Sequence, residues 1–427
     1  MPDDPRSLAL DILVSVERDR AFADAELGYR LAVCKMNQPD RGLATNLVYG
    51  TLAWRLRIDT ILESFLKRKL SALDCIPREI LRMGLYQIAF LDRVPDYAAV
   101  NASVDLAKRR CRAAAGLVNA VLRRATREGC ELPQAESGVA ALAVRYSHPP
   151  WLVDLWLHEL GEPKAVALMQ ADNRANPNVA RALVDRPKVV KGAKHGRWAP
   201  DAWVLDAPAA AQTPFVMQSE ASQLATLFLG VCRGRRILDA CASPGGKAAY
   251  LGRLVGESGS VIALDPAPGS AARITASAAA GRVSNVEARE IPLQQLSPEE
   301  SFDAVLVDAP CSGLGTLRQH PEIRWRRRPG DLRRLAGKQG AILSAAASHV
   351  RTGGRLVYST CTLARVENDD VVERFLATHG NFREDHDASD IDAAVTQVVD
   401  EQGRLRMYPD SHDTDGFFAA RFQKIAP

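Results

Sequence analysis

The sequence predicts a multidomain protein in which an all-α N-terminal domain precedes an α/β domain with a doubly wound, mostly parallel sheet. Apolar positions in the first part recur with the period of a helix. From about residue 218, short apolar runs alternate with helical stretches, as in parallel sheets covered by helices. We therefore expect three parts: a helical domain over 1–130, a linker and small α+β subdomain over 131–217, and the α/β domain over 218–427.

The N-terminal elements are predicted from single apolar faces. The segment "IDTILESFL" places five apolar residues on one side of a helix, namely Ile58, Ile61, Leu62, Phe65 and Leu66. Residues 129–146 are small and polar, so we expect a linker there. The segment "YSHPPWLVDLWLHELG" then starts a new unit with a proline pair and a helical pattern.

The strands of the α/β domain are predicted from apolar runs that end at small-residue turns. These runs are "RRILDA", "GSVIALDP", "FDAVLVDAPC" and "GGRLVYSTCT", and the tail "GFFAARFQK" predicts one more strand, antiparallel to the rest. Ligands of open α/β sheets bind at the carboxyl ends of the strands, so the residues that follow these runs are the candidates for a site.

Composition and charge narrow the function classes. With 47% apolar and 25% charged residues, the chain has the composition of an ordinary globular protein. Residues 1–130 hold 21 Lys and Arg against 16 Asp and Glu, which favours a polyanionic partner. The eight cysteines form no C-x-x-C pair and histidine is sparse, so we expect no metal site. The scattered cysteines suit a reducing cytoplasm, and we expect neither a signal peptide nor a membrane-spanning run.

The glycine-rich turn "LDACASPGGKAA" resembles two nucleotide motifs and matches neither. A P-loop would need Gly at 241 and Ser or Thr at 248, and a dinucleotide fingerprint would need a third glycine. The turn still lets a ligand approach the backbone, and Asp265, nineteen residues after Gly246, is placed to bind a ribose diol. The ligand we expect is a nucleoside without a phosphate. The alternative is a tight turn with Asp265 at the surface.

Two cysteines follow predicted strands: Cys311 in "LVDAPCSGLGT" and Cys361 in "LVYSTCTLARVEN". If the sheet binds S-adenosylmethionine, two thiols have a use in methylating cytosine. One thiolate adds to C6 and makes C5 nucleophilic, Asp308 acts as an acid at N3, and the second thiolate removes the C5 proton. Lys247 is the candidate that stabilises a thiolate. Spacing does not say which thiol has which role, and two buried strand-end cysteines are the alternative.

The motifs "DACASPGGK", "DAPCSGLGTLRQHPEIRW", "YSTCTLARVEND" and "DGFFAARF" resemble those of the RsmB/NOP2 superfamily of RNA cytosine-C5 methyltransferases, Fmu/Sun or RsmB type. The N-terminal "LRMGLYQIAFLDRVPDYAAVNASVDLAKRR" and "GLVNAVLRR" are similar to the NusB-like RNA-binding domain. The combination resembles the bacterial 16S rRNA cytosine-C5 methyltransferases. It implies a NusB-like helical domain followed by a Rossmann-like S-adenosylmethionine-dependent methyltransferase domain.

The resemblance also implies residue roles. Cys361 becomes the nucleophile, Cys311 the releasing base and Asp308 the cytosine N3 acid, with Lys247 beside them. The cofactor pocket would be lined by Asp308 and by these residues: Cys241, Ala242, Ser243, Pro244, Gly245, Gly246, Lys247, Asp265 and Glu290. The substrate would be 16S rRNA or a small-subunit assembly intermediate, and the protein a monomer.

The sequence departs from the family pattern around the cofactor. Ser219, Ala248 and Ser270 stand where the family usually has Asp, Thr and Arg, Glu290 is the nearest acid to the usual adenine Asp, and "NPNVARALVD" lacks the usual Leu-Arg-Val-Asn. These departures motivate a second hypothesis, an RNA-binding ribosome-assembly factor with a degraded methyltransferase domain. A third hypothesis keeps the chemistry and makes tRNA the substrate.

Basic segments are the candidates for RNA contact. The arginine-rich segment 317–334 begins six residues after Cys311, and its guanidinium groups could hold phosphates while Trp325 stacks on a base. The predicted RNA-binding residues are Arg324, Trp325, Lys108, Arg109, Arg110, Arg123 and Arg124. Solvated helix faces without a partner are the alternative.

Overall fold

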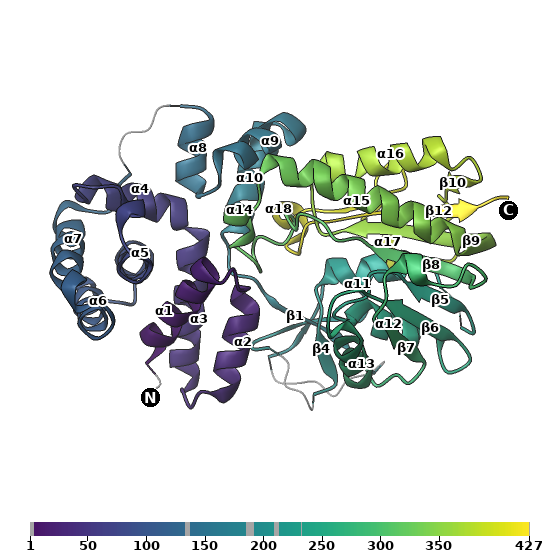
Figure 1. Ribbon diagram of the computed structural model, residues 1–427, viewed down its shortest axis with the longest axis horizontal. Coiled ribbons are helices and arrows are strands. Elements are labelled where there is room, and N and C mark those ends of the chain that lie inside the picture. Colours follow the sequence, from purple (N-terminus) through teal and green to yellow (C-terminus); the bar gives the residue numbers. More distant parts are fainter. Residues whose placement is uncertain (1–3, 133–136, 185–191, 209–212, 232, 427) are drawn as a thin grey trace. The chain divides into compact units, whose positions relative to one another are not determined.

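The computed structural model describes residues 4–132, 137–184, 192–208, 213–231 and 233–426. Within them the chain forms two units and passes from one to the other three times (Figure 1). The first, here called the helical unit, holds the chain up to Ala175 together with Leu317–Arg327. The second, the sheet unit, holds Asn176–Thr316 and the chain from Arg328 onward.

The helical unit is built from α-helices and two 3₁₀ turns. Its helices are α1 (Pro5–Arg18), α2 (Ala23–Val33), α3 (Gln38–Ala53), α4 (Arg55–Phe65), α5 (Cys75–Phe90), α6 (Asp96–Arg110), α7 (Ala115–Glu128), α8 (Val139–Tyr146), α9 (Pro150–Leu160), α10 (Glu162–Asp172) and α14 (Ile323–Arg326). Local sequence explains where α1 and α3 begin. The Asp4 side chain accepts a hydrogen bond from the Arg6 amide at the start of α1, and the Asn37 side chain accepts one from the Asp40 amide at the start of α3. A proline lies in the first turn of both helices.

Close packing of α1, α3, α5 and α7 makes the core of this unit. Leu10, Leu47, Ile80 and Leu122 are fully buried in one apolar cluster. Ile58, Ile61 and Leu62 from the predicted face of α4 are buried there too, with Phe65 and Leu66 partly so. The amphipathic pattern thus predicted the helix faces correctly.

The predicted linker over 129–146 is wrong for its second half, because α8 (Val139–Tyr146) occupies it. Residues 133–136 lie outside the described residues. Small residues predict a linker, but Ala143 of this helix is buried. The predicted limits of the first domain also differ from the observed unit, which continues through α9 and α10 to Ala175.

The sheet unit contains two sheets. A four-stranded antiparallel sheet has the order β2-β3-β1-β4, with β1 (Asn178–Ala182), β2 (Lys194–His195), β3 (Ala202–Leu205) and β4 (Phe215–Met217). The larger sheet has the order β10-β12-β9-β8-β5-β6-β7, and β11 pairs with β12. Its strands are β5 (Arg236–Asp239), β6 (Ser260–Leu264), β7 (Val286–Arg289), β8 (Phe302–Asp308), β9 (Val350–Thr360), β10 (Phe382–Glu384), β11 (Leu405–Met407) and β12 (Phe417–Lys424).

Helices cover both faces of the larger sheet (Figure 1). Successive residues of β8 show the alternation, since Leu306 packs in one apolar cluster and Val305 in the other. The helices of this unit are α11 (Glu220–Leu227), α12 (Gly246–Val255), α13 (Ser270–Ala280), α15 (Pro329–Ser348), α16 (Asp369–Thr378), α17 (Ala393–Thr396) and α18 (Pro409–His412). Residues of α11–α13 belong to the first cluster, and those of α15 and α16 to the second.

The strand directions decide where a site can form. Strands β5–β9 are parallel, so their carboxyl ends meet at one edge. The antiparallel β12 begins at this same edge, where Phe418 pairs with Thr360. The predicted fold class and the antiparallel final strand are confirmed. Among the described helices, none is long and apolar enough to cross a membrane.

Candidate active site

Two thiols face each other at the carboxyl edge of the larger sheet. Cys311 follows β8 and Cys361 follows β9, and their Sγ atoms lie 3.3 Å apart. The neighbouring strands β8 and β9 pair in parallel up to Asp308 and Ser359, so both chains leave the sheet at the same level. The register of the sheet thus brings together two cysteines that are fifty residues apart in sequence.

Buried polar bonds tie the two cysteine loops together. The Ser312 amide donates to Glu367 Oε1 at 2.9 Å, and that oxygen also accepts from Gln339 Nε2. The Ser312 and Thr362 hydroxyl oxygens are 2.7 Å apart. Because unsatisfied buried polar groups are costly, a shift of either loop would break several of these bonds at once. The residue after each cysteine therefore holds the loop in place.

A glycine pair brings a third segment to this edge. The Gly315 amide donates to the Cys361 carbonyl at 2.9 Å, and the Gly416 amide donates to the Gly315 carbonyl at 2.7 Å. A Cβ on Gly315 would lie 2.1 Å from the Gly416 carbonyl oxygen. Only glycine permits this approach. The tail motif "DGFF" therefore packs directly against the loop of Cys311.

A charged pair lies beside the thiols. Lys247 Nζ is 2.6 Å from Asp308 Oδ2, and Ser359 Oγ donates to Asp308 Oδ1 at 3.0 Å. The ammonium also lies over the Phe417 ring, 5.3 Å from its centroid. Lys247 and Asp308 come from the glycine turn after β5 and from the end of β8, so the sheet assembles the pair.

The electrostatics of this edge favour a charged Lys247 and a protonated Cys311. Burial disfavours the charged Lys247, but the Asp308 carboxylate outweighs it, so the pKa of Lys247 is raised and the ammonium persists at neutral pH. The pKa of Cys311 is raised well above its ordinary value. The main cause is the hydrogen bond between Cys311 and Cys361, and the second cause is burial. The thiol of Cys361 is among the groups that raise the Lys247 pKa. Within the pair, Cys311 therefore keeps its proton and Cys361 lies in the field of a cation.

Asp239 adds a second carboxyl group that sequence reasoning had not selected. It ends β5 and is fully buried. Burial, and then the nearby Asp308 carboxylate, raise the pKa of Asp239 to about 7. The signal in the sequence was an acid that directly follows an apolar strand and precedes the glycine turn.

The glycine turn fits a nucleoside cofactor. Gly245 has φ +109°, and a Cβ there would lie 2.8 Å from the Ile274 Cα, so this glycine makes the tight turn. A Cβ on Gly246 would meet only Gln218 Nε2, at 4.0 Å, so the start of α12 is open to a ligand. Lys247 is engaged with Asp308 instead of extending toward a phosphate site. The peptide bond between Ser243 and Pro244 is cis.

The acidic residues predicted for the cofactor lie at neighbouring strand ends. Asp265 follows β6, and its carboxylate accepts from the Ala267 amide at 2.9 Å and from the Ser243 amide at 3.3 Å. Glu290 follows β7 and is exposed. Its chain neighbour Arg289 accepts a backbone hydrogen bond from the Asp265 amide, so the two strand ends are adjacent. Cys241 and Ala242 continue the turn from β5, so the predicted cofactor residues share one edge.

Three departures from the family pattern have structural explanations. Ser270 Oγ donates to the Asp265 carbonyl at 2.7 Å and so supports the turn after β6. Ser219 caps α11, where its side chain accepts from the Ser222 amide. Ala248 is fully buried in the core. Each residue is integrated into the fold at its position.

The comparisons with known proteins cover both parts of the chain. Residues 226–423 match the family described as 16S rRNA methyltransferase RsmB/F, and residues 3–127 match the NusB family. The chain is 33% identical to the probable ribosomal RNA small subunit methyltransferase B of Bacillus subtilis over 98% of both chains. It is 35% identical to ribosomal RNA small subunit methyltransferase B of Thermus thermophilus, covering 99% of this chain and 98% of the relative.

The chain belongs to the RsmB family of 16S rRNA methyltransferases. The crystal structure of PH0851 shares its fold across the whole length, with a TM-score of 0.82, 23% identity and 99% of both chains covered. The predicted combination of a NusB-like region with a methyltransferase domain is confirmed. Use of S-adenosylmethionine is a property of the family.

Arg324 and Trp325, predicted to contact RNA, belong to the helical unit. Arg324 is fully buried in the helical unit, and the Trp325 indole donates to the Leu52 carbonyl at 2.8 Å. A desolvated guanidinium bound by protein oxygens offers no group to a phosphate, so the predicted role of Arg324 needs correction. The misleading signal was its arginine-rich context, which composition alone could not separate into buried and exposed parts.

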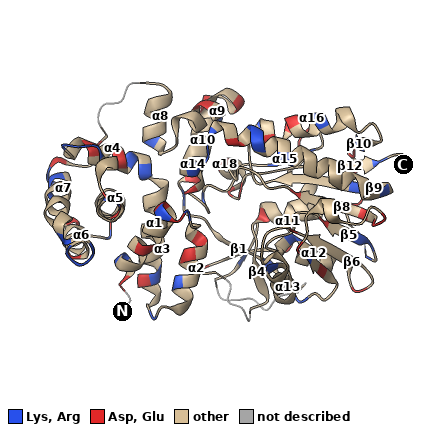
Figure 2. Cartoon of the chain, viewed as in Figure 1, with Lys and Arg blue, Asp and Glu red and all other residues tan. Residues whose placement is uncertain are grey.

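The predicted basic residues of the N-terminal region lie on α6 and α7 (Figure 2). Arg109 and Arg110 pair with the α1 side, at Asp4 (2.9 Å) and Asp11 (2.5 Å). Lys108 pairs with Asp105, Arg124 with Glu128, and Arg123 donates to Asn119. Exposed pairs of this kind are weak and exchange readily for other anions. Their contact with RNA stays a prediction.

Proposed function

We propose that this member of the RsmB family transfers a methyl group from S-adenosylmethionine to C5 of a cytosine in 16S rRNA. The observation that carries the proposal is the pair of thiols 3.3 Å apart, beside the Lys247–Asp308 pair. The cofactor residues would be the glycine turn, Asp265 and Glu290. When bound, S-adenosylmethionine supplies an electrophilic methyl group; every other step falls to the side chains at the sheet edge.

Cys361 is the nucleophile in this scheme. Its thiolate adds to C6 of the cytosine, which places electron density on C5, and the Lys247 ammonium favours the anionic sulfur before attack. Asp308 faces N3, where a proton neutralises the charge that develops in the ring. The Lys247 ammonium, 2.6 Å away, can resupply that proton through the carboxylate. Ser359 holds the other oxygen of Asp308 in place.

Cys311 is the base that ends the reaction. Before attack it is protonated, because two thiolates 3.3 Å apart repel each other. Once Cys361 forms a carbon–sulfur bond, that sulfur carries no charge and accepts no strong hydrogen bond. The pKa of Cys311 then falls, and its thiolate can take the proton from C5. The electrons of the broken C5–H bond restore the ring double bond and expel the Cys361 thiolate from C6. The proton on N3 then returns to Asp308, which leaves a neutral 5-methylcytosine.

The test uses the purified chain, methyl-labelled S-adenosylmethionine and unmodified 16S rRNA, digested to nucleosides after reaction. We expect label in 5-methylcytidine, and none when a tRNA pool replaces the rRNA. Label only with tRNA would keep the chemistry and change the substrate. No label with either RNA, while calorimetry shows that S-adenosylmethionine binds, would contradict the proposal.

A further inference from the structure

Two carboxylates and one imidazole come together within the helical unit. These are the side chains of Asp24, His320 and Glu322, here called the histidine–carboxylate cluster. Asp24 lies in the first turn of α2, and the other two directly precede α14, which belongs to the same unit. One ligand atom from each side chain lies within 4.8 Å of the other two. Local spacing of cysteine and histidine predicts no metal site, but this cluster joins residues 296 positions apart.

Glu322 contributes a buried oxygen atom that helix capping does not explain. The residue is 1% exposed. Its Oε1 accepts a hydrogen bond from the Ala23 amide at 3.1 Å and so caps the start of α2. Its Oε2 is buried and has no hydrogen-bond partner among the residues that the structure describes. A buried carboxylate oxygen without a partner is costly, so a donor or a cation at Oε2 would stabilise the fold.

His320 contributes a nitrogen atom in the same condition. Within the described part of the chain, its buried Nδ1 has no hydrogen-bond partner. The Asp24 Oδ1 atom is 3.6 Å from it, which is beyond hydrogen-bond distance. Phe22 packs edge-on against the imidazole, with ring centroids 6.0 Å apart and an interplanar angle of 79°. The ring therefore has a defined position, and the lone pair of a neutral imidazole is a common metal ligand.

The distances suit a small metal ion. Ligand atoms about 2.0–2.1 Å from a tetrahedral zinc ion lie about 3.3 Å from one another, close to the 3.6 Å between His320 Nδ1 and Asp24 Oδ1. The Asp24 side chain is 47% exposed, so it can turn toward an ion without disturbing the core. The Arg326 guanidinium also acts on Glu322 and offsets part of the negative charge. Backbone carbonyls at and after the end of α1 accept its hydrogen bonds and hold it there.

The donor atoms select the kind of metal. Mg²⁺ and Ca²⁺ prefer sites made of oxygen alone, whereas one imidazole with carboxylates suits a divalent transition metal. Zn²⁺ is often held by three protein ligands of these types and one water molecule. We propose that the histidine–carboxylate cluster binds a divalent transition-metal ion, with Zn²⁺ as the best match. The ion would join α2 to the segment before α14 inside the helical unit, and it takes no part in the proposed methyl transfer.

The experiment titrates the metal-free, full-length chain with Zn²⁺ by isothermal titration calorimetry. The paired thiols could bind Zn²⁺ themselves, so every titration uses a background that carries Cys311→Ala and Cys361→Ala. His320→Gln and Asp24→Asn are compared with this background, and His158→Gln is the matched control. His158 is an exposed histidine of α9 in the same unit. Thermal unfolding with and without Zn²⁺ gives a second readout that needs no RNA.

We expect the background to bind one Zn²⁺ more than His320→Gln does. Asp24→Asn should weaken binding at this site at least tenfold, and His158→Gln should leave it unchanged. Because a ligand of the folded state raises Tm, Zn²⁺ should raise it in the background and in His158→Gln, and less in His320→Gln. The same concentration of Mg²⁺ should not reproduce the shift.

Two results would overturn the proposal. Equal stoichiometry and equal Tm shifts in the background and in His320→Gln would place any bound Zn²⁺ at other residues. Absence of Zn²⁺ binding, together with a lower Tm in His320→Gln, would show that His320 is an imidazolium paired with the two carboxylates. If His320→Gln does not fold, Asp24→Asn at the surface decides between the same outcomes. Failure of the methylation assay would not affect either readout.

Discussion

The carboxyl edge of the sheet and the arginine-rich segment 317–334 are separated by a few residues of chain, yet their sequences were informative to very different degrees. At the sheet edge, each candidate residue follows an apolar strand, and the parallel topology brings the strand ends together. In the arginine-rich segment, the arginines look alike in sequence, but Arg324 is buried and Arg333 is exposed. A residue's place on a strand end is set locally, whereas burial of an arginine depends on distant acceptors.

The largest effect is expected at the sheet edge, from Cys361→Ala. Methylation should fall to background because the sulfur assigned to bond C6 is removed and Cys311 is assigned to the later proton removal, while Tm should change by only a few degrees. Cys311→Ala is the matched control, since it keeps the nucleophile and should trap the covalent adduct. Residual 5-methylcytidine formation by the Cys361 variant at more than a trace would disprove the assignment of the nucleophile.

The next largest effect is expected from Lys247→Gln, which should lower kcat about 10²–10³-fold. Without the ammonium, the Cys361 thiolate loses its neighbouring cation and Asp308 loses its ion-pair partner. The rate of alkylation of Cys361 by iodoacetamide, measured in a Cys311→Ala background, should fall. An unchanged alkylation rate would show that Lys247 does not act on the thiol.

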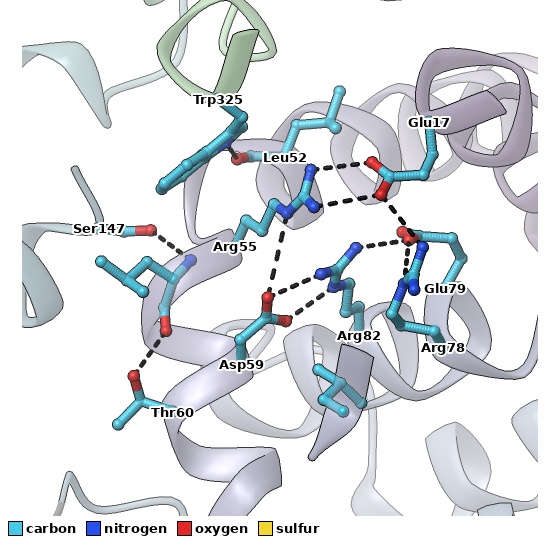
Figure 3. A network of polar contacts seen from close by, with 12 residues as sticks. Glu17, Leu52, Arg55, Asp59, Thr60, Arg78, Glu79, Arg82, Ser147 and Trp325 are labelled. Carbon is cyan, nitrogen blue, oxygen red and sulfur yellow. Dashed lines mark hydrogen bonds and ion pairs between the residues drawn. The ribbon is translucent and has the colours of Figure 1, made fainter. Parts of the chain in front are cut away.

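The buried ion network of the helical unit allows a prediction about stability that does not depend on catalysis (Figure 3). Arg82 pairs with Glu79 at 2.5 Å and with Asp59 at 2.7 Å, and the side chains of Arg82 and Glu79 are 5% and 3% exposed. Arg82→Ala leaves the buried Glu79 with only the longer pair to Arg78, at 3.7 Å, and should cost about 3–5 kcal/mol of unfolding free energy. The exposed pair Arg124–Glu128 is the control, where Arg124→Ala should cost less than about 1 kcal/mol.

A pH-dependent effect is expected from Asp239→Asn. The folded-state pKa of Asp239, about 7, is above its ordinary value, so folding retains a proton that the unfolded chain loses. This contribution favours folding fully below about pH 4 and is lost as pH rises toward 7. The variant lacks it, so its Tm relative to wild type should rise from pH 4.5 to 7 and then stay level. A constant difference would show that Asp239 titrates normally.

The smallest effect is expected from Arg109→Ala on the surface of α6. Loss of its pair with Asp4 should change the unfolding free energy by less than about 1 kcal/mol. If the basic face binds RNA, KM for rRNA should rise a few-fold and depend less steeply on salt. Salt titrations of RNA binding by wild type and variant would give the slopes; equal slopes would remove Arg109 from the interface.

Much of the catalytic edge was predictable because each part of the prediction depended on a short segment of sequence. The apolar runs gave the strands, parallel order gave the shared edge, and motif resemblance assigned Cys311 and Cys361. The helical unit was less predictable: the small residues of α8 form a weak helical pattern, which predicts a linker. The roles of Glu367 and Ser359 were missed because a buried bond to a distant amide or carboxylate leaves no local signal.

The short distance between the two sulfurs also makes the protein sensitive to oxidants. A disulfide needs the Sγ atoms at about 2.05 Å, and they start 3.3 Å apart in neighbouring loops. Loss of two electrons and two protons to a peroxide or a small disulfide would remove the nucleophile and the base together. Activity should then return when dithiothreitol reduces the disulfide. The short distance that allows one thiol to release the other therefore also allows oxidising conditions to inactivate both.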